Sequence, residues 1–132
     1  MNQVTEEMLR IYKPVSGLDW LNYKLVKKNV TYHHIIKKEQ GGKRIIENGA
    51  LLMPIAHQYL HLIECVDIDT YVAINKIFGI INKQREEPIK EQREIIEYML
   101  SEFERVHKWD KKNNGKLLLQ KKYLERDFNR SK

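Results

Sequence analysis

The chain has 132 residues, a formal net charge of +6, 42% hydrophobic residues and 32% charged residues. This length predicts a single domain, residues 1–132, that is large enough to bury a core without disulfide bonds. The composition is that of a folded protein, and the absence of an uncharged apolar run of ~18 residues argues against a membrane partner.

Two further features concern location and partners. Cys65 is the only cysteine, so no internal disulfide can form, and residues 1–10 lack the apolar core of a signal peptide. We therefore expect a cytoplasmic protein. The positive charge favours a polyanionic partner such as DNA, because each neutralised phosphate releases condensed counterions.

The first 29 residues are expected to support the segment that follows them. Residues 1–15 are predicted to be a short polar start with at most one capped helical turn, because Pro14 would end an early helix. Residues 16–29 contain apolar side chains that can brace a strand. Trp20 and Tyr23 among them either pack in the core or stack on nucleic-acid bases.

Residues 30–36 are rich in β-branched and aromatic side chains and are predicted to form a strand that carries His33 and His34. Neighbouring strand residues point to opposite faces, so one imidazole can bind a metal ion while the other stays unligated. A polar loop, 37–44, follows and contains Gly41 and Gly42. The loop carries four cations, Lys37, Lys38, Lys43 and Arg44. These side chains are either solvated in a surface turn or in contact with phosphate groups.

Residues 45–53 are predicted to form a second strand, interrupted at Asn48 and Gly49. Asn-Gly is a common hairpin turn, and an Asn side chain can also pin a loop by hydrogen bonds, so both interpretations stay open. A helix is expected from Pro54 to Glu64. Its residues His57 and His61 have the i, i+4 spacing that places two imidazoles on one face, as two ligands of one metal ion require.

The order of these residues resembles the ββα-metal, or HNH, endonucleases, especially the colicin-type branch whose first motif element is His-His. An Asn stands fourteen residues after His34, a His nine residues after that Asn, and a further His four residues later. The resemblance covers about residues 30–64 and implies an α+β fold with a ββα-metal core.

The resemblance also implies roles for five side chains. His33, His57 and His61 would hold one divalent metal ion, Mg, Mn, Ni or Zn. His34 would be the general base, and Asn48 would pin the loop behind it. The implied reaction is hydrolysis of DNA phosphodiester bonds, as nicking or double-strand cleavage, with a 5′-phosphate and a 3′-hydroxyl as products.

The chain departs from the family pattern at two places. Many members bind a structural zinc ion through paired cysteines, but the equivalent positions here are Met53 and Ala56, so we expect no such zinc. Gly49 stands after Asn48, where a leucine is common in the family.

The rest of the chain is predicted to be helical. Asp67 or Asp69 is expected to cap a helix that ends near Gln84, and Pro88 is expected to begin another that ends near Lys108. These two helices, at about 67–108, would form a hairpin that supports the ββα core or makes a dimer face. The apolar positions expected in the core are Ile68, Tyr71, Val72, Ile74, Phe78 and Ile81 in the first helix, and Ile89, Ile95, Ile96, Met99, Leu100, Phe103 and Val106 in the second.

The last histidine and the tail stand apart from the motif. His107 is interpreted as a surface residue. The basic tail at about 109–132 is predicted to form an amphipathic C-terminal helix that docks on the body, pairs with a partner or lies along nucleic acid.

Three functions are compared on this basis. The first is an HNH endonuclease, encoded by a phage or mobile element, whose targeting comes from a packaging or recombination partner. The second is a non-catalytic module that binds nucleic acid and uses the ββα-metal unit as a structural site, but an unligated His34 has no use there. The third is a toxin-type nuclease, which a 132-residue chain with a helical second half disfavours.

Overall fold

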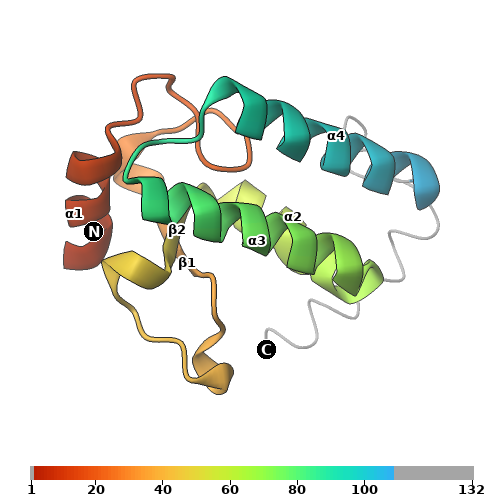
Figure 1. Cartoon of the computed structure of the whole chain (residues 1–132), viewed down its shortest axis with the longest axis horizontal. Coiled ribbons are helices and arrows are strands. Elements are labelled where there is room, and N and C mark those ends of the chain that lie inside the picture. Colours follow the sequence, from red (N-terminus) through yellow and green to blue (C-terminus); the bar gives the residue numbers. More distant parts are fainter. Residues whose placement is uncertain (1, 109–132) are drawn as a thin grey trace.

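The computed structural model describes residues 2–108 and has an α+β fold, in which four helices surround a small antiparallel sheet (Figure 1). The helices are α1 (Gln3–Tyr12), α2 (Pro54–Val66), α3 (Ile68–Gln84) and α4 (Lys90–Val106), and the strands are β1 (Thr31–His34) and β2 (Gly49–Leu52). None of the helices in this described part is long and apolar enough to cross a bilayer. The predicted C-terminal helix falls in 109–132, outside the described residues.

The three later helices follow local signals in the sequence. Pro54 occupies the first turn of α2, where its missing N–H costs no hydrogen bond. The Asp67 side chain caps α3 by accepting a hydrogen bond from the Thr70 N–H, so of the two expected capping residues Asp67 is the one used. α4 begins at Lys90, two residues after Pro88, and runs antiparallel to α3 (Figure 1).

The N-terminal segment is more ordered than the sequence suggested. Instead of one turn, α1 has ten residues, capped by the Asn2 side chain and ended by Lys13 in a left-handed conformation, directly before Pro14. Met8 and Tyr12 on its inner face are buried, and the Tyr12 hydroxyl donates to the Asn82 carbonyl at 2.6 Å. Tertiary burial of this face stabilises a helix that its own length would not.

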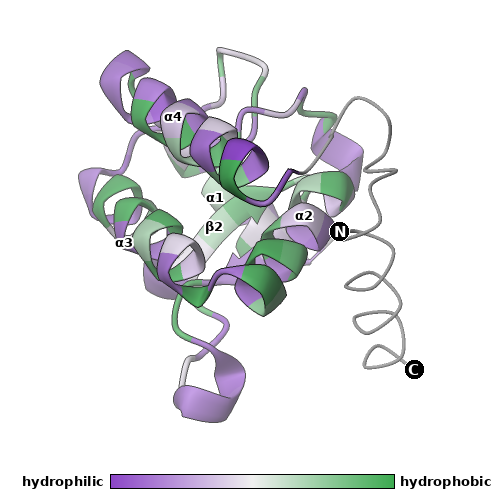
Figure 2. Cartoon of the chain, turned by 90° about the vertical axis from the view of Figure 1, so that its right-hand side faces the viewer, coloured by the Kyte–Doolittle hydropathy of each residue, from purple (hydrophilic) through white to green (hydrophobic). Residues whose placement is uncertain are grey.

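The two strands are shorter than predicted, with four residues each instead of seven and nine. Their register pairs Thr31 with Leu52 and His34 with Gly49. After His34 one more backbone bond follows, from the Ile35 N–H to the Asn48 carbonyl, and the Ile36 N–H then bonds to the side chain of Asn48 instead of to the backbone. All residues of β2 are buried, and Figure 2 shows this strand between the helices.

The core lies between the sheet and the four helices. Trp20 is 1% exposed and packs edge-on against the rings of Tyr12 and Phe78, so it is a core residue and cannot stack on a base. The buried Asn82 amide donates to the carbonyls of Ile46 and Gly49, which ties α3 to the start of β2. Tyr23 is half-buried and packs against the same cluster.

Several positions predicted for the core are exposed. On α3, Ile68 and Val72 lie on the outer face, 54% and 43% exposed. In the second helix, the exposed positions are Ile95 and Val106 of α4 and Ile89, which directly precedes it. Helical spacing identified an apolar side of each helix, but that side is wider than the neighbouring elements cover.

His107 is also different from its prediction as a plain surface residue. Its Nε2 lies 3.2 Å from a carboxylate oxygen of Asp67, and its ring packs 4.9 Å from that of Phe103. It therefore ties the end of α4 to the junction of α2 and α3.

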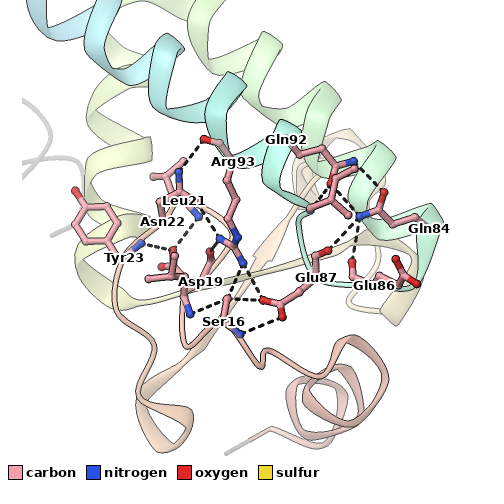
Figure 3. Close-up of polar contacts among 12 residues, drawn as sticks. Ser16, Asp19, Leu21, Asn22, Tyr23, Gln84, Glu86, Glu87, Gln92 and Arg93 are labelled. Carbon is pink, nitrogen blue, oxygen red and sulfur yellow. Dashed lines mark hydrogen bonds and ion pairs between the residues drawn. The ribbon is translucent and has the colours of Figure 1, made fainter.

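Arg93 of α4 attaches that helix to the segment after α1 (Figure 3). Its guanidinium donates to the Asp19 carbonyl, the Asn22 side chain, the Ser16 hydroxyl and the Glu87 carboxylate. Glu87 also accepts from the Ser16 backbone N–H. Five donors in a rigid fork suit this task, which a lysine could not perform.

The Asp19 carboxylate organises the same segment from inside. It is fully buried and accepts from the backbone N–H groups of Leu21 and Tyr23 at 2.8 and 2.9 Å, and from that of Met53 at 2.8 Å. This last bond joins the loop before β1 to the residue that precedes α2, and so sets the start of the helix that carries His57 and His61.

We predict that Asp19→Asn lowers the free energy of unfolding by about 2–3 kcal/mol, because an amide NH₂ must then face at least one of the buried N–H donors. Urea denaturation measures the loss. Asp69→Asn makes the same change at an exposed position in the first turn of α3 and should cost less than about 0.5 kcal/mol. Equal losses in the two variants would contradict the role assigned to Asp19.

Candidate functional site

Four histidines from β1 and α2 line one cavity of about 300 Å³. His33 and His34 come from the strand, and His57 and His61 come from one face of the helix. The other lining residues are Lys37, Lys38, Glu39, Leu60, Glu64 and Tyr71. Residues that are separated in the sequence by up to 38 positions therefore form one site, since the cavity spans 33 to 71.

The two strand histidines have different surroundings. His33 is 5% exposed and points toward the helices, where its ring lies 5.3 Å from His57 and 5.8 Å from Phe78. His34 packs edge-on against Tyr32, two residues earlier on the strand, at 4.9 Å. This difference follows the alternation of strand side chains, which leaves His34 the more accessible of the pair.

Oxygen acceptors fix the proton on two of the imidazoles. His33 Nε2 lies 2.8 Å from Oδ1 of Asn75, which can only accept, so Nε2 carries the proton. His57 Nδ1 lies 3.2 Å from the Thr31 hydroxyl, whose own proton is donated to the Leu52 carbonyl. His57 must therefore donate from Nδ1, which leaves Nε2 as an unprotonated nitrogen.

His61 lies next to a carboxylate, because its Nδ1 is 3.3 Å from an oxygen of Glu64. His33 and His57 thus each donate from one nitrogen to an oxygen partner and carry a lone pair on the other. This is the protonation pattern of metal-binding histidines, whose second nitrogen commonly donates to a carboxylate or carbonyl.

The predicted convergence of His33, His57 and His61 on one centre is not observed. Among residues 2–108, no three side chains of His, Cys, Asp or Glu are placed so that they could hold a metal ion together. The hydrogen bond to Asn75 holds the His33 ring in its orientation, and the contact with Glu64 does the same for His61. Imidazole nitrogens are suitable ligands for a divalent ion. The three side chains would have to rotate before their nitrogens could meet at one point.

Burial keeps three of the histidines neutral near pH 7. Desolvation lowers the pKa of His33 to about 4, although the hydrogen bond to Asn75 acts in the opposite direction. Desolvation, followed by repulsion from His61, lowers the pKa of His57. For His34 the causes of a lowered pKa are desolvation and then the charges of Arg44 and Lys38.

Asn48 holds the loop between the strands. Its side-chain oxygen accepts from the Ile36 N–H at 2.8 Å, and its NH₂ donates to the carbonyls of Ile36 and Lys43 at 3.0 and 3.1 Å. Gly42 makes this close approach possible, because a Cβ there would lie 1.8 Å from the Ile36 oxygen. Gly41 has φ of +88° and supplies the turn itself.

The alternative that Asn48 and Gly49 form a hairpin turn is wrong. Asn48 ends a short 3₁₀ helix (Ile46–Asn48), and Gly49 begins β2 with φ of −109°, whereas a two-residue turn of this type needs positive φ at both positions. Glycine is required at 49 for space. A Cβ would lie 2.4 Å from the Tyr32 ring and 2.8 Å from the Met8 sulfur.

The four predicted phosphate-binding cations do not share one environment. Lys37 and Lys38 line the histidine cavity, and Lys37 forms an ion pair with Glu64 while lying 5.5 Å from the centre of the Tyr71 ring. Arg44 lies over the Tyr32 ring at 5.1 Å. Lys43 contributes its carbonyl to the loop, and its side chain is exposed.

Four residues of the site were not predicted from the sequence. Glu64 could have been found, because it lies three residues after His61 and seven after His57, on the same helical face. Thr31 is two residues before His33 on the same face of a strand, which is a weaker signal. Asn75 and Tyr71 come from α3, and only the packing of that helix against β1 and α2 brings them to the histidines.

Comparisons with protein families, with curated proteins and with solved structures give no match.

We predict that the metal-free protein loses stability as the pH falls from 6.5 to 4. In this window unfolded His33, with an ordinary pKa of 6.5, takes up a proton that the folded residue, with a pKa of about 4, excludes. The stabilisation is complete above pH 6.5, and its loss by pH 4 amounts to about 2–3 kcal/mol.

Urea denaturation in EDTA at a series of pH values measures this dependence. His33→Gln has no titrating group at this position and can still donate to Asn75, so its stability should vary less over the same window. An identical pH dependence in the variant would contradict the burial of a neutral His33.

Proposed function

We propose that this chain is a metal-dependent endonuclease of the HNH type that hydrolyses phosphodiester bonds in DNA. The observation that carries the proposal is the arrangement of four histidines from a β-hairpin and the helix after it around one cavity, with Asn48 closing the loop beside them. In the ββα-metal family that the sequence resembles, groups of these kinds act on the phosphate. The support for the proposal is that imidazoles and lysine side chains line the same cavity.

His34 is the residue proposed to take the proton from the attacking water. It lines the cavity, is partly exposed, and has a pKa lowered by desolvation and by nearby cations, so the neutral, basic form is present at pH 7. Its contact with the Tyr32 ring and the clamped loop behind it limit the directions in which it can point.

His33, His57 and His61 would hold one divalent ion through their unprotonated nitrogens. When bound, such an ion supplies Lewis acidity to the phosphate and stabilises the departing oxygen. Imidazole ligands favour Zn, Ni or Mn, and Mg is also used where waters and phosphate complete the shell.

Lys37 and Lys38 supply positive charge at the rim of the cavity. Lys37 pairs with Glu64, which also holds His61. An entering phosphate would compete with Glu64 for Lys37, and so the carboxylate is a positioning residue for both partners.

We expect the wild-type protein to nick supercoiled plasmid DNA in the presence of Mg, Mn, Ni or Zn and to stop when EDTA is added. His34→Ala should reduce nicking by at least about 100-fold while metal binding, measured by calorimetry, stays the same. His61→Ala should weaken both.

His107→Ala is the matched control, because it removes a histidine that pairs with Asp67 outside the cavity. This variant should nick as the wild type does. Full activity in His34→Ala would remove that residue from the role of base. A plasmid that shifts in a gel but is never nicked, with any metal, would select the non-catalytic binding module instead.

Glu64→Gln should weaken the binding of Ni or Zn by about tenfold, because the neutral amide is a poorer acceptor for the His61 N–H and makes the imidazole a weaker donor. Calorimetry on the isolated protein measures this without any DNA. Glu91→Gln removes the same charge from an exposed position on α4 and should leave metal affinity unchanged. Equal affinities in both variants would show that Glu64 does not act through His61.

A further inference from the structure

A second cavity, of about 590 Å³, lies beside the histidine cavity. It is bounded by the loop after β1, the end of α2 and the outer face of α3. Its lining residues are Ile35, Lys37, Gln40, Glu64, Ile68, Tyr71, Val72, Asn75, Lys76 and Gly79. Lys37, Glu64 and Tyr71 line both cavities, so the two are adjacent.

One wall of this second cavity is an apolar shelf on α3. Its positions 68, 72, 75 and 79 recur at helical spacing and form one stripe. Ile68 and Val72 are 54% and 43% exposed, although both are aliphatic. Gly79 leaves the end of the shelf open, because a Cβ built there would meet no atom within 4 Å.

The polar groups around the shelf include an amide, two lysines and one carboxylate. Gln40 brings a carboxamide that can both donate and accept hydrogen bonds, whereas the Asn75 oxygen is already hydrogen-bonded to His33. Lys76 brings positive charge to the rim, and Lys37 is paired there with Glu64. A ligand that suits this surface has a flat apolar face, a hydrogen-bonding edge and a negative charge next to it.

We propose that this groove holds the base of a nucleotide next to the phosphate in the histidine cavity, so that the protein acts on unpaired nucleic-acid strands. The inference rests on the proposed function, since it assigns the phosphate to the histidine cavity. A base can pack its face on the exposed aliphatic side chains of Ile68 and Val72 while its edge meets the Gln40 carboxamide, and the adjoining phosphates meet the lysines.

The same geometry disfavours a fully paired duplex. In a duplex each base is stacked and paired inside the helix, so a base could enter the groove only after it leaves the stack, at a cost in free energy. A single strand has no such cost. The expected substrate is therefore single-stranded DNA, or a duplex with a bulge or frayed end.

The test is binding without catalysis. Fluorescence anisotropy in EDTA measures the affinity for a labelled single strand of about 12 nucleotides and for the matching duplex. We expect the single strand to bind at least about tenfold more tightly.

Two variants at one position test the groove by its volume. Gly79→Leu places a side chain in the open end of the shelf and should weaken single-strand binding by at least about fivefold. Gly79→Ala adds only a methyl group and should bind normally. Both replace a helical glycine and should melt at or above the wild-type temperature, which shows that the fold is retained.

Two further variants test the groove by its charge. Val72→Asp and Ile80→Asp each add one carboxylate at an exposed aliphatic position of α3, but only Val72 lines the groove. Val72→Asp should weaken single-strand binding at least about fivefold more than Ile80→Asp, since long-range repulsion is similar in both.

Duplex binding that equals or exceeds single-strand binding would overturn the inference. So would Gly79→Leu or Val72→Asp binding as tightly as its control. These outcomes are separate from failure of the proposed function, which is the absence of cleavage, with every metal, of both supercoiled plasmid and single-stranded DNA. If the protein binds single strands through this groove and never cleaves DNA, the inference about the groove holds and the nuclease proposal is rejected.

Discussion

The hydrogen bonds of the Asn48 side chain are the constraint on which the site depends. One amide joins the loop after β1 to the residue before β2, and it holds Ile36 and Lys43 at the same time. The loop can close this tightly only because Gly42 has no Cβ to meet the Ile36 carbonyl. With the loop closed, His34 and the cations that follow it stay next to the histidines of α2.

Around this loop, the histidines depend on oxygen partners from other elements. Asn75 and Thr31 each occupy one nitrogen of His33 and His57 and so determine which nitrogen carries the lone pair, and Glu64 lies next to His61. Burial favours the neutral imidazole at His33, His34 and His57 and outweighs the opposing hydrogen bond between His33 and Asn75. The neutral form is the one that the proposed metal binding and proton transfer need.

The two faces of α3 have different roles. Its inner face carries Phe78 and Asn82 into the core and brings Asn75 to His33. Its outer face carries Ile68 and Val72 into the open groove next to the histidine cavity. An apolar side wider than the core needs is costly in water unless something covers it, which is why the groove on this face is the place assigned to a ligand.

The sequence by itself determined the α+β class, the helix that begins at Pro54 and the order of the histidines, because these follow from spacing and from single-residue signals such as proline and Asp67. It did not determine the length of α1, the exposure of Ile68 and Val72, or the pairing of Lys37 with Glu64. Those depend on which element covers which face, and periodicity alone does not contain that information. The oxygen partners of His33 and the missing common centre of the three imidazoles likewise come from the packing of α3 against β1 and α2, since side-chain direction is decided by contacts between residues far apart in the chain.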